Sequence, residues 1–170
     1  MTGWRVRPAL AGDAGAMATL LNAIIARGGT TAHETPFDAT GIVAHYVAPP
    51  LGICCTLAQA RGRILGFQAL EWCDPHWNGP DPLPADWAVV ASFVAPDAQG
   101  RGIGRALWAV TRATASGAGV VAVDATIRAD NAGGLGFYAA LGFRDYGRLI
   151  GVPLAGGARV DRIRKRYDLG

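Results

Sequence analysis

Apolar residues along the 170-residue chain follow two repeating patterns, and these divide it into segments typical of strands and of helices. Alternating or continuous apolar runs predict strands, whereas apolar positions spaced three and four residues apart predict helices. The predicted strands are Trp4–Pro8, Ile53–Gln59, Ile64–Trp72, Trp87–Val94, Val120–Ile127, Arg144–Ile150 and Arg162–Leu169. Helices are predicted after Asp13, after Asp38, after the glycine-rich bend at residues 99–104 and after Asn131, with glycines ending the first, third and fourth near residues 28, 117 and 142. Strands and helices therefore mix along the chain, as in an α/β fold.

Two groups of these segments also predict how the strands pair. The short link Ala60–Arg63 joins two strand-like runs, so these runs should form an antiparallel hairpin. Trp87–Val94 is apolar on both faces, as expected for a strand in the middle of a covered sheet. It leads through a helix to Val120–Ile127, which predicts a right-handed parallel β-α-β unit. Cys73–Ala85 contains five prolines and glycines, so we expect an irregular surface loop.

Composition narrows the class of protein. A chain of this length with 51% hydrophobic residues is expected to form one domain, residues 1–170. The net charge of +3 comes with scattered arginines, which argues against nucleic acid or membrane partners. Three cysteines suggest neither a disulfide framework nor a metal site. The N-terminus lacks the pattern of a signal peptide, so a cytoplasmic protein is expected. The basic run Arg162–Arg166 is interpreted as the solvent-exposed face of an edge strand.

The glycine-rich bend Gln99–Arg105 carries the main candidate chemistry. Gly100, Gly102 and Gly104 leave the backbone N–H groups exposed at the start of a helix, where an anion binds favourably. Gln99, Arg101 and Arg105 add donors and positive charge, which favours a pyrophosphate. The glycine spacing does not fit a dinucleotide fingerprint, and the lysine of a Walker loop is absent. The sequence therefore predicts a phosphorylated cofactor of another type.

Two motifs resemble those of the GNAT superfamily of N-acetyltransferases. Gln99-x-x-Gly102-x-Gly104, after a strand ending Phe93-Val94-Ala95-Pro96, is similar to the family's acetyl-CoA motif. The run from Asn131 to Phe143 is similar to the asparagine, tyrosine and LGF pattern that follows the second cofactor strand. The resemblance implies a mixed, mostly antiparallel sheet of about six or seven strands flanked by about four helices, with a parallel pair at the cofactor site.

The resemblance also implies roles for individual residues. Backbone groups near Phe93 and Val94 would pair with the pantetheine arm, the glycine-rich bend would hold the pyrophosphate, and Asn131 would bind the arm from the other side. Tyr138 matches the family's general acid. The residues expected to bind acetyl-CoA are Phe93, Val94, Gln99, Gly100, Arg101, Gly102, Ile103, Gly104, Arg105, Asn131 and Tyr138.

The whole chain is similar to the phosphinothricin-acetyltransferase branch, which acetylates the amino group of small amino-acid-like compounds. In the polar loop before Asp38, Glu34 and Phe37 are candidate substrate contacts, while His33 is interpreted as part of a solvated connection. That branch often carries a glutamate in the strand where this chain has Val89, Val90 and Ala91. The general base is therefore open among three carboxylates, with Glu71 as the first candidate beside Asp86 and Glu34.

The sequence thus predicts an acetyl-CoA-dependent N-acetyltransferase, without a metal, that acts on the primary amine of a small molecule by direct attack on the thioester. The resemblance to this family also implies a homodimer. The alternative is a CoA-binding sensor or regulatory module without turnover, which the missing glutamate permits. A nucleotide-binding enzyme of Rossmann type is a third hypothesis, and it would bind NAD in place of CoA.

Overall fold

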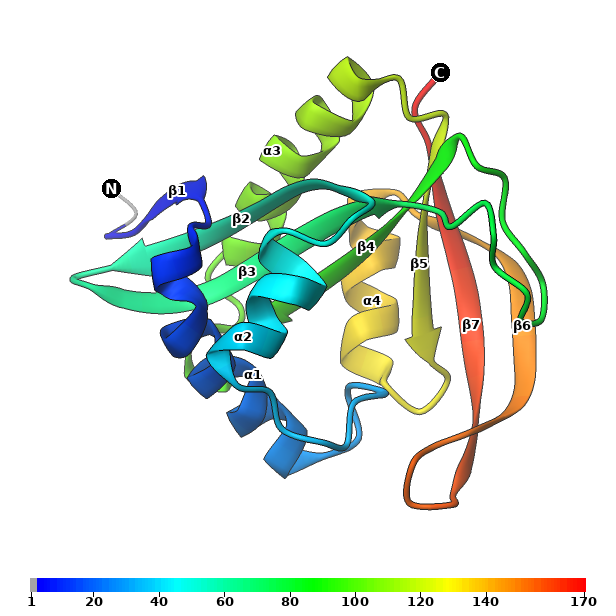
Figure 1. Cartoon of the computed structure of the whole chain (residues 1–170), viewed down its shortest axis with the longest axis horizontal. Coiled ribbons are helices and arrows are strands. Elements are labelled where there is room, and N and C mark those ends of the chain that lie inside the picture. Colours follow the sequence, from blue (N-terminus) through cyan, green and yellow to red (C-terminus); the bar gives the residue numbers. More distant parts are fainter. Residues whose placement is uncertain (1–2) are drawn as a thin grey trace.

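A computed structural model describes residues 3–170, which form one seven-stranded sheet with helices on both faces (Figure 1). The strands stand in the order β1-β2-β3-β4-β5-β7-β6. Their bounds are β1 Arg5–Pro8, β2 Gly52–Ala60, β3 Arg63–Trp72, β4 Trp87–Val94, β5 Ala122–Arg128, β6 Arg144–Pro153 and β7 Arg159–Asp168. Among the strands that the structure describes, only β4 and β5 pair in parallel, which confirms the mixed, mostly antiparallel sheet expected from the sequence.

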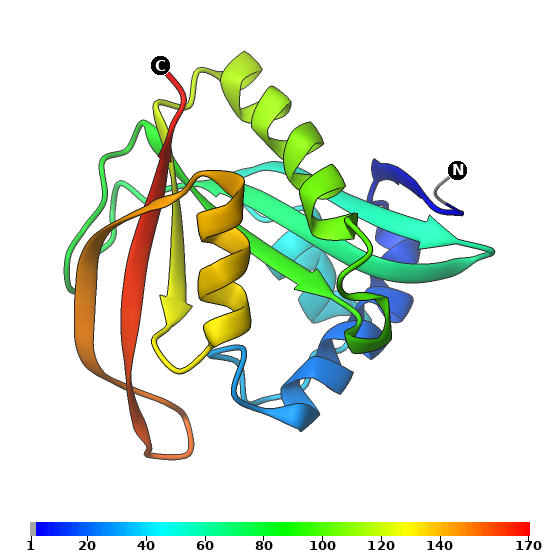
Figure 2. The same cartoon turned by 180° about the vertical axis from the view of Figure 1, so that it is seen from behind.

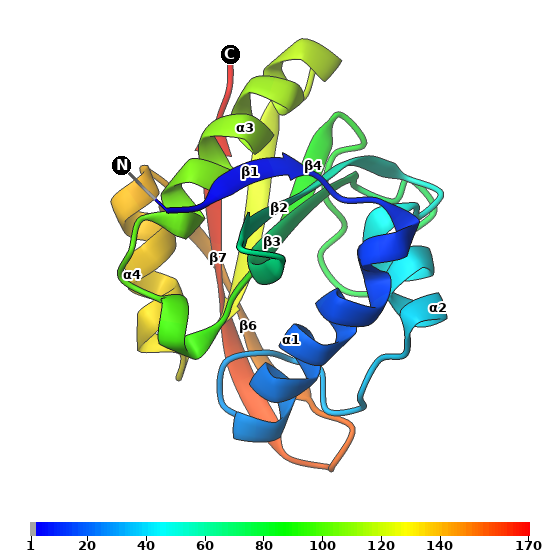
Figure 3. The ribbon, with the colours of Figure 1, turned by 90° about the vertical axis from the view of Figure 1, so that its left-hand side faces the viewer.

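Four α-helices cover the sheet, two on each face (Figures 1 and 2). Helices α1, Ala14–Arg27, and α2, Ala39–Ile42, lie on one face, and α2 continues into a π-helical turn at Val43–Val47. Helices α3, Ile103–Ala118, and α4, Ala132–Leu141, lie on the other, as the side view in Figure 3 shows. In the part of the chain that the structure describes, no helix is long and apolar enough to cross a membrane.

Local signals in the sequence place most of these elements. The turn between β2 and β3 contains Arg61 and Gly62, both with positive φ, as a tight two-residue hairpin requires. Asp38 caps α2 through a hydrogen bond from Gly41 N, and Asn131 caps α4 through one from Gly134 N. Gly142, with φ of 102°, ends α4 as predicted.

The parallel pair β4 and β5 separates soon after it begins. Register between the two strands covers only Trp87–Val89 of β4 and Ala122–Asp124 of β5. Beyond these residues β4 stays paired with β3 to Val94, and β5 stays paired with β7 to Arg128. The diverging strand ends are visible from behind in Figure 2. The sheet is therefore open in its middle, between the carboxyl-terminal halves of two neighbouring strands.

The expectation that the basic run belongs to an edge strand is wrong. Strand β7 is hydrogen-bonded to β5 on one side and to β6 on the other, so β6 is the edge. The charges are accommodated because other side chains lie against them. The Arg164 guanidinium lies 5.8 Å from the centroid of the Tyr146 ring, and that of Arg166 lies 5.5 Å from the centroid of the Trp87 ring.

The hydrophobic core has two centres. The first lies mainly between α1, α2 and the β2–β3 hairpin and includes Met17, Leu21 and Phe67, all fully buried. The second lies between the sheet and helices α3 and α4 and includes Trp108, Tyr138 and Phe143. Side chains alternate across each strand, so β4 sends Phe93 toward the first centre and Ser92 toward the second. The central strands are thus covered on both faces.

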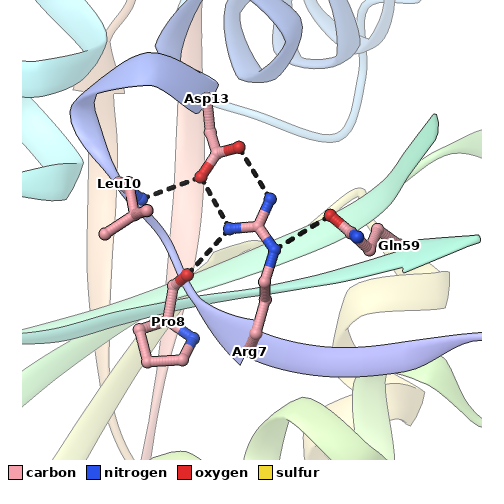
Figure 4. A network of polar contacts seen from close by, with 5 residues as sticks. All are labelled: Arg7, Pro8, Leu10, Asp13 and Gln59. Atoms are coloured by element: carbon pink, nitrogen blue, oxygen red, sulfur yellow. Dashed lines mark hydrogen bonds and ion pairs between the residues drawn. The ribbon is translucent and has the colours of Figure 1, made fainter. Parts of the chain in front are cut away.

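A polar network ties the first strand to the first helix (Figure 4). Arg7 donates to both carboxylate oxygens of Asp13, at 2.7 and 2.8 Å, and also to Gln59. Asp13 was expected to cap α1, and it does stand directly before that helix. Its carboxylate, however, accepts from Leu10 N, because a short 3₁₀ turn at Ala11–Asp13 precedes α1 and moves the free N–H groups back along the chain.

We predict that Asp13→Ala lowers the free energy of unfolding by about 2 kcal/mol, because it leaves the half-buried Arg7 without its charged partner. The partnership also lowers the pKa of Asp13. The contribution of the Arg7–Asp13 pair to the free energy of unfolding should therefore be present at neutral pH and be lost as the pH falls through the lowered pKa of Asp13. Denaturant unfolding at pH 7 and pH 3 measures both effects. The matched control is Asp97→Ala, which removes an equally bidentate but exposed pair with Arg63 and should leave stability nearly unchanged.

Candidate active site

A cavity of about 890 Å³ lies where β4 and β5 diverge, and its wall contains residues from both faces of the sheet. On the α3 and α4 face the wall includes the glycine-rich bend, Ser92 and Tyr138. On the α1 and α2 face it includes His33, Tyr46 and Arg162. Because the sheet is open between the two strands, one ligand from each face can meet in the gap.

The glycine-rich bend forms the part of the wall at the start of α3. Gly100 and Gly102 have φ of 73° and 80°, and Gly102 is the residue directly before the helix. A Cβ added at either glycine would meet nothing within 4 Å, so the backbone there borders open space. Free N–H groups at a helix N-terminus suit a phosphate. Of the predicted cofactor residues, all line the cavity except Arg101, which is exposed beside it.

Gly104 has a packing role that the sequence did not reveal. It is buried in the first turn of α3, and a Cβ on it would lie 2.5 Å from Cε2 of Phe137 in α4. The absence of a side chain therefore lets the Phe137 ring sit against the first turn of α3. Phe137 itself lines the cavity, so Gly104 shapes the wall through its neighbour.

A hydrogen-bond chain connects three elements at the gap. The Tyr138 hydroxyl of α4 lies 2.9 Å from Oγ of Ser92 in β4, and Gln68 Nε2 of β3 donates to the same Oγ at 2.7 Å. Burial raises the pKa of Tyr138 to about 12, although its hydrogen bond with Ser92 acts in the opposite direction. The phenol therefore stays protonated at neutral pH and is available as a donor.

Asn131 connects the loop after α1 with the start of α4, and both of these segments line the cavity. Its Oδ1 caps α4, while its Nδ2 donates to the carbonyl oxygen of Thr30 at 3.1 Å. The loop after α1 is also held by Arg128, which donates to the carbonyl oxygen of Thr31. Asn131 thus fixes this loop against the start of α4.

His33 is the wall residue that the sequence interpretation missed. Its Nε2 lies 2.6 Å from the hydroxyl of Tyr46, and its ring packs edge-on against Phe37 and His45. Burial, together with the positive charges of His45 and Arg162, lowers the pKa of His33. No periodicity marks this residue, because the loop that carries it is ordered by contacts with the π-helical turn Val43–Val47 and with Arg128 of β5.

The other predicted catalytic and substrate residues lie outside the cavity wall. Glu71 is half-buried near the end of β3, and burial raises its pKa while His45 acts in the opposite direction. Glu34 is exposed and accepts a hydrogen bond from Gly156 N at 2.6 Å. Phe37 packs behind His33, and Asp86 is exposed at the start of β4. Within residues 3–170, the cavity wall contains no aspartate or glutamate.

Comparison with known proteins agrees with this geometry. Residues 15–143 match the family model described as acetyltransferase (GNAT) family. Over 93 residues the chain is 35% identical to mycothiol acetyltransferase from Tsukamurella paurometabola, a match that covers 54% of this chain and 29% of that relative. The chain therefore spans less than a third of the length of this relative.

Solved structures share the whole architecture at low identity. A proposed acetyltransferase from Salmonella typhimurium, solved with its cofactor acetyl-CoA, has a TM-score of 0.82 at 19% identity, covering 99% of this chain and 95% of that one. A proposed phosphinothricin N-acetyltransferase has a TM-score of 0.80 at 20% identity, with 98% and 99% covered. These similarities establish a common fold.

Proposed function

Because the chain belongs to the acetyltransferase (GNAT) family, we propose that it transfers an acetyl group from acetyl-CoA to the primary amine of a small molecule. The observation that carries this proposal is the cavity between β4 and β5, which is bordered by an anion-binding bend on one face of the sheet and by a separate wall on the other. One substrate can enter from each face, as direct transfer between two bound molecules requires.

The residues on the α3 and α4 face fit the donor. The N–H groups around Gly100 and Gly102 would hold its pyrophosphate, and Arg105 adds positive charge. The edge of β4 from Val90 to Val94 faces the cavity and not β5, so its backbone groups are available to the amide-containing arm of CoA. Acetyl-CoA, when bound, would supply an activated acetyl thioester.

The reaction balances as one substitution at the acetyl carbon. The acceptor nitrogen forms a bond to that carbon and the carbon–sulfur bond breaks. Starting as an ammonium, the nitrogen loses one proton before the attack and a second as the amide forms, and the second proton ends on the departing thiolate, which leaves as the CoA thiol. We propose that the hydroxyl of Tyr138 donates a hydrogen bond to the leaving sulfur. A phenol with a pKa near 12 is a weaker acid than a thiol of about 8.5, so a hydrogen bond to the thiolate is favoured over complete proton transfer.

We propose that His33 accepts the proton that the acceptor ammonium loses before the attack. Within residues 3–170, His33 is the cavity-wall side chain whose ordinary pKa lies nearest neutrality, and no carboxylate lines that wall. When Nε2–H donates to Tyr46, the lone pair on Nδ1 is left to accept a proton from the acceptor ammonium, directly or through water. Glu71 is the competing candidate, and from its position outside the wall it would act through His45 or water.

We predict that His33→Gln lowers kcat/KM about 100-fold at pH 7. Because the pKa of His33 is below its ordinary value, the neutral base is present at pH 7, and wild-type activity should fall only as the pH drops through that lowered pKa. The variant should lose this acidic limb and recover toward wild type near pH 10, where the amine deprotonates without help. Steady-state pH profiles measure both effects.

The matched control is Glu71→Gln, which should change kcat/KM less than about threefold if His33 is the base. A large loss with Glu71→Gln beside a normal His33→Gln profile would assign the base to Glu71.

The acceptor is proposed to be an amino acid or an amino-acid-like compound. The fold shared with a proposed phosphinothricin N-acetyltransferase supports this class, as do the polar side chains His33, Tyr46 and Arg162 of the cavity wall. On this proposal the protein works in the cytoplasm as a homodimer, and gel filtration with light scattering would measure the assembly.

Calorimetric titration of acetyl-CoA, with NAD and ATP as controls, tests the donor. Release of free CoA thiol with a panel of amino acids, sulfoximines and polyamines then tests turnover. Selective acetyl-CoA binding with turnover supports an enzyme. Binding without turnover of any amine would favour the alternative, a CoA-binding sensor. A folded protein that fails to bind acetyl-CoA contradicts both.

A further inference from the structure

The charged residues of the cavity wall are all basic in the part of the chain that the structure describes. They are Arg27, Arg105, Arg128 and Arg162, and no aspartate or glutamate accompanies them. Arg105 belongs to α3 beside the bend that fits the donor phosphates. Arg128 and Arg162 belong to β5 and β7, on the far side of the gap in the sheet.

The side chain of Arg128 already has hydrogen-bond partners within the protein. Its Nε and Nη2 donate to the two carboxylate oxygens of Asp130, at 2.9 and 2.8 Å, and its Nη1 donates to the carbonyl oxygen of Thr31. Only 13% of its side chain is exposed. Arg128 therefore acts as a fixed part of the wall that orders the loop before His33.

Arg162 contrasts with its neighbour. It is half-buried and lines the cavity, yet its side chain has no hydrogen bond or ion pair with any residue in the range 3–170, and its Nε is buried without an acceptor. It stands directly opposite Arg128 in the β5–β7 pairing, so both side chains project from the same face. Burial, followed by the charge of Arg128, lowers the pKa of Arg162.

This arrangement is unfavourable unless an anion balances it. A partly buried guanidinium whose Nε has no acceptor loses part of its hydration without a compensating hydrogen bond, and a like charge beside it adds to the cost. Nε of Arg164 and of Arg166, on the same face of β7, is also buried without a hydrogen bond, but each lies near a carboxylate oxygen, of Asp124 at 3.8 Å and of Asp168 at 3.2 Å. Arg162 differs from them in that it faces the cavity.

Resting on the proposed function, we propose that Arg162 binds a carboxylate on the acceptor, so that the substrate is an amino acid whose amine faces His33 and the gap between β4 and β5. The geometry agrees, because Arg162 and His33 line the same cavity on the same face of the sheet and lie close enough to interact electrostatically. The glycine-rich bend that fits the donor phosphates belongs to α3, on the other face.

The test compares matched acceptors and matched products in wild type and Arg162→Gln. Turnover is measured by thiol release with the twenty standard amino acids, β-alanine and 4-aminobutyrate, each beside its amide. Binding is measured by thermal denaturation of the CoA-saturated protein with the N-acetyl derivatives of the same acids and amides. We expect at least one acid to be preferred to its amide by about 10- to 100-fold in kcat/KM, the range expected for a hydrogen bond to a charged group.

In Arg162→Gln that preference should fall to about twofold or less. Arg162→Lys should restore part of it, because the charge remains while the bidentate geometry is lost. The control is Arg166→Gln, on the same face of β7 but outside the cavity wall, which should keep the wild-type preference.

Each other outcome overturns the proposal. If no acid is preferred to its amide in either assay, or if the preference survives in Arg162→Gln, the acceptor does not bind there through a carboxylate. If Arg162→Gln weakens acetyl-CoA itself about tenfold, the guanidinium serves a phosphate of the donor. If wild type does not bind acetyl-CoA at all, the proposed function fails first, and this result is seen before any acceptor is tested.

Discussion

Gly102→Asp should raise the Kd of acetyl-CoA at least 100-fold while leaving the protein folded. The new carboxylate would occupy open space at the N-terminus of α3, where the donor phosphates are proposed to bind. Loss of even two hydrogen bonds to a charged phosphate accounts for an effect of this size, and repulsion between anions adds to it. Titration calorimetry on the purified variant measures the change.

The fold should tolerate this substitution. A φ of 80° at a non-glycine residue costs about 1–2 kcal/mol, but a carboxylate at the start of a helix interacts favourably with the free N–H groups. Gly102→Ala is the matched control, because it introduces the same backbone strain without charge and should weaken binding about tenfold or less. An unchanged acetyl-CoA Kd in the aspartate variant would remove the bend from the donor site.

Tyr138→Phe should lower kcat about 100- to 1,000-fold and leave the Kd of acetyl-CoA within about twofold. Phenylalanine preserves the packing of the ring between Phe137 and Phe143, whose centroids lie 4.9 and 5.1 Å away, so the loss would come from the hydroxyl. Because the pKa of Tyr138 is about 12, wild type should show no basic limb from this residue below pH 10.

Single-turnover acetylation after rapid mixing separates the chemical step from product release. Ser92→Ala is the companion variant, since it removes the hydroxyl that lies 2.9 Å from Tyr138 Oη and should lower the rate less. A fully active Tyr138→Phe enzyme would mean that the residue serves packing alone.

The sequence predicted the strands, the helices and the parallel pair because these depend on local patterns and caps. It did not predict the position of β7, because the order of strands in a sheet depends on pairing between distant segments. The basic run there looked solvent-exposed, yet Trp87 and Tyr146 cover two of its arginines from other parts of the chain.

The candidate site likewise contains residues that the sequence predicted and residues that it did not. The glycine-rich bend and Tyr138 belong to continuous motifs, and the structure brings both to one cavity. His33 and Arg162 come from a loop and a distant strand, 129 positions apart, and neither has a sequence pattern that marks it. The side chains expected to set substrate choice are thus the ones that tertiary structure alone brings together.

We expect the three residue pairs that join β4 to β5 to act as a hinge as well. The sheet consists of two panels, β1 to β4 and β5 to β7. Ser92, the hydrogen-bond partner of Tyr138, belongs to the first panel, and Arg162 belongs to the second. The distance between the two bound substrates therefore depends on the angle at which the panels meet. A change of packing at Ala88 or Val123, both fully buried at that junction, should alter kcat without touching either ligand.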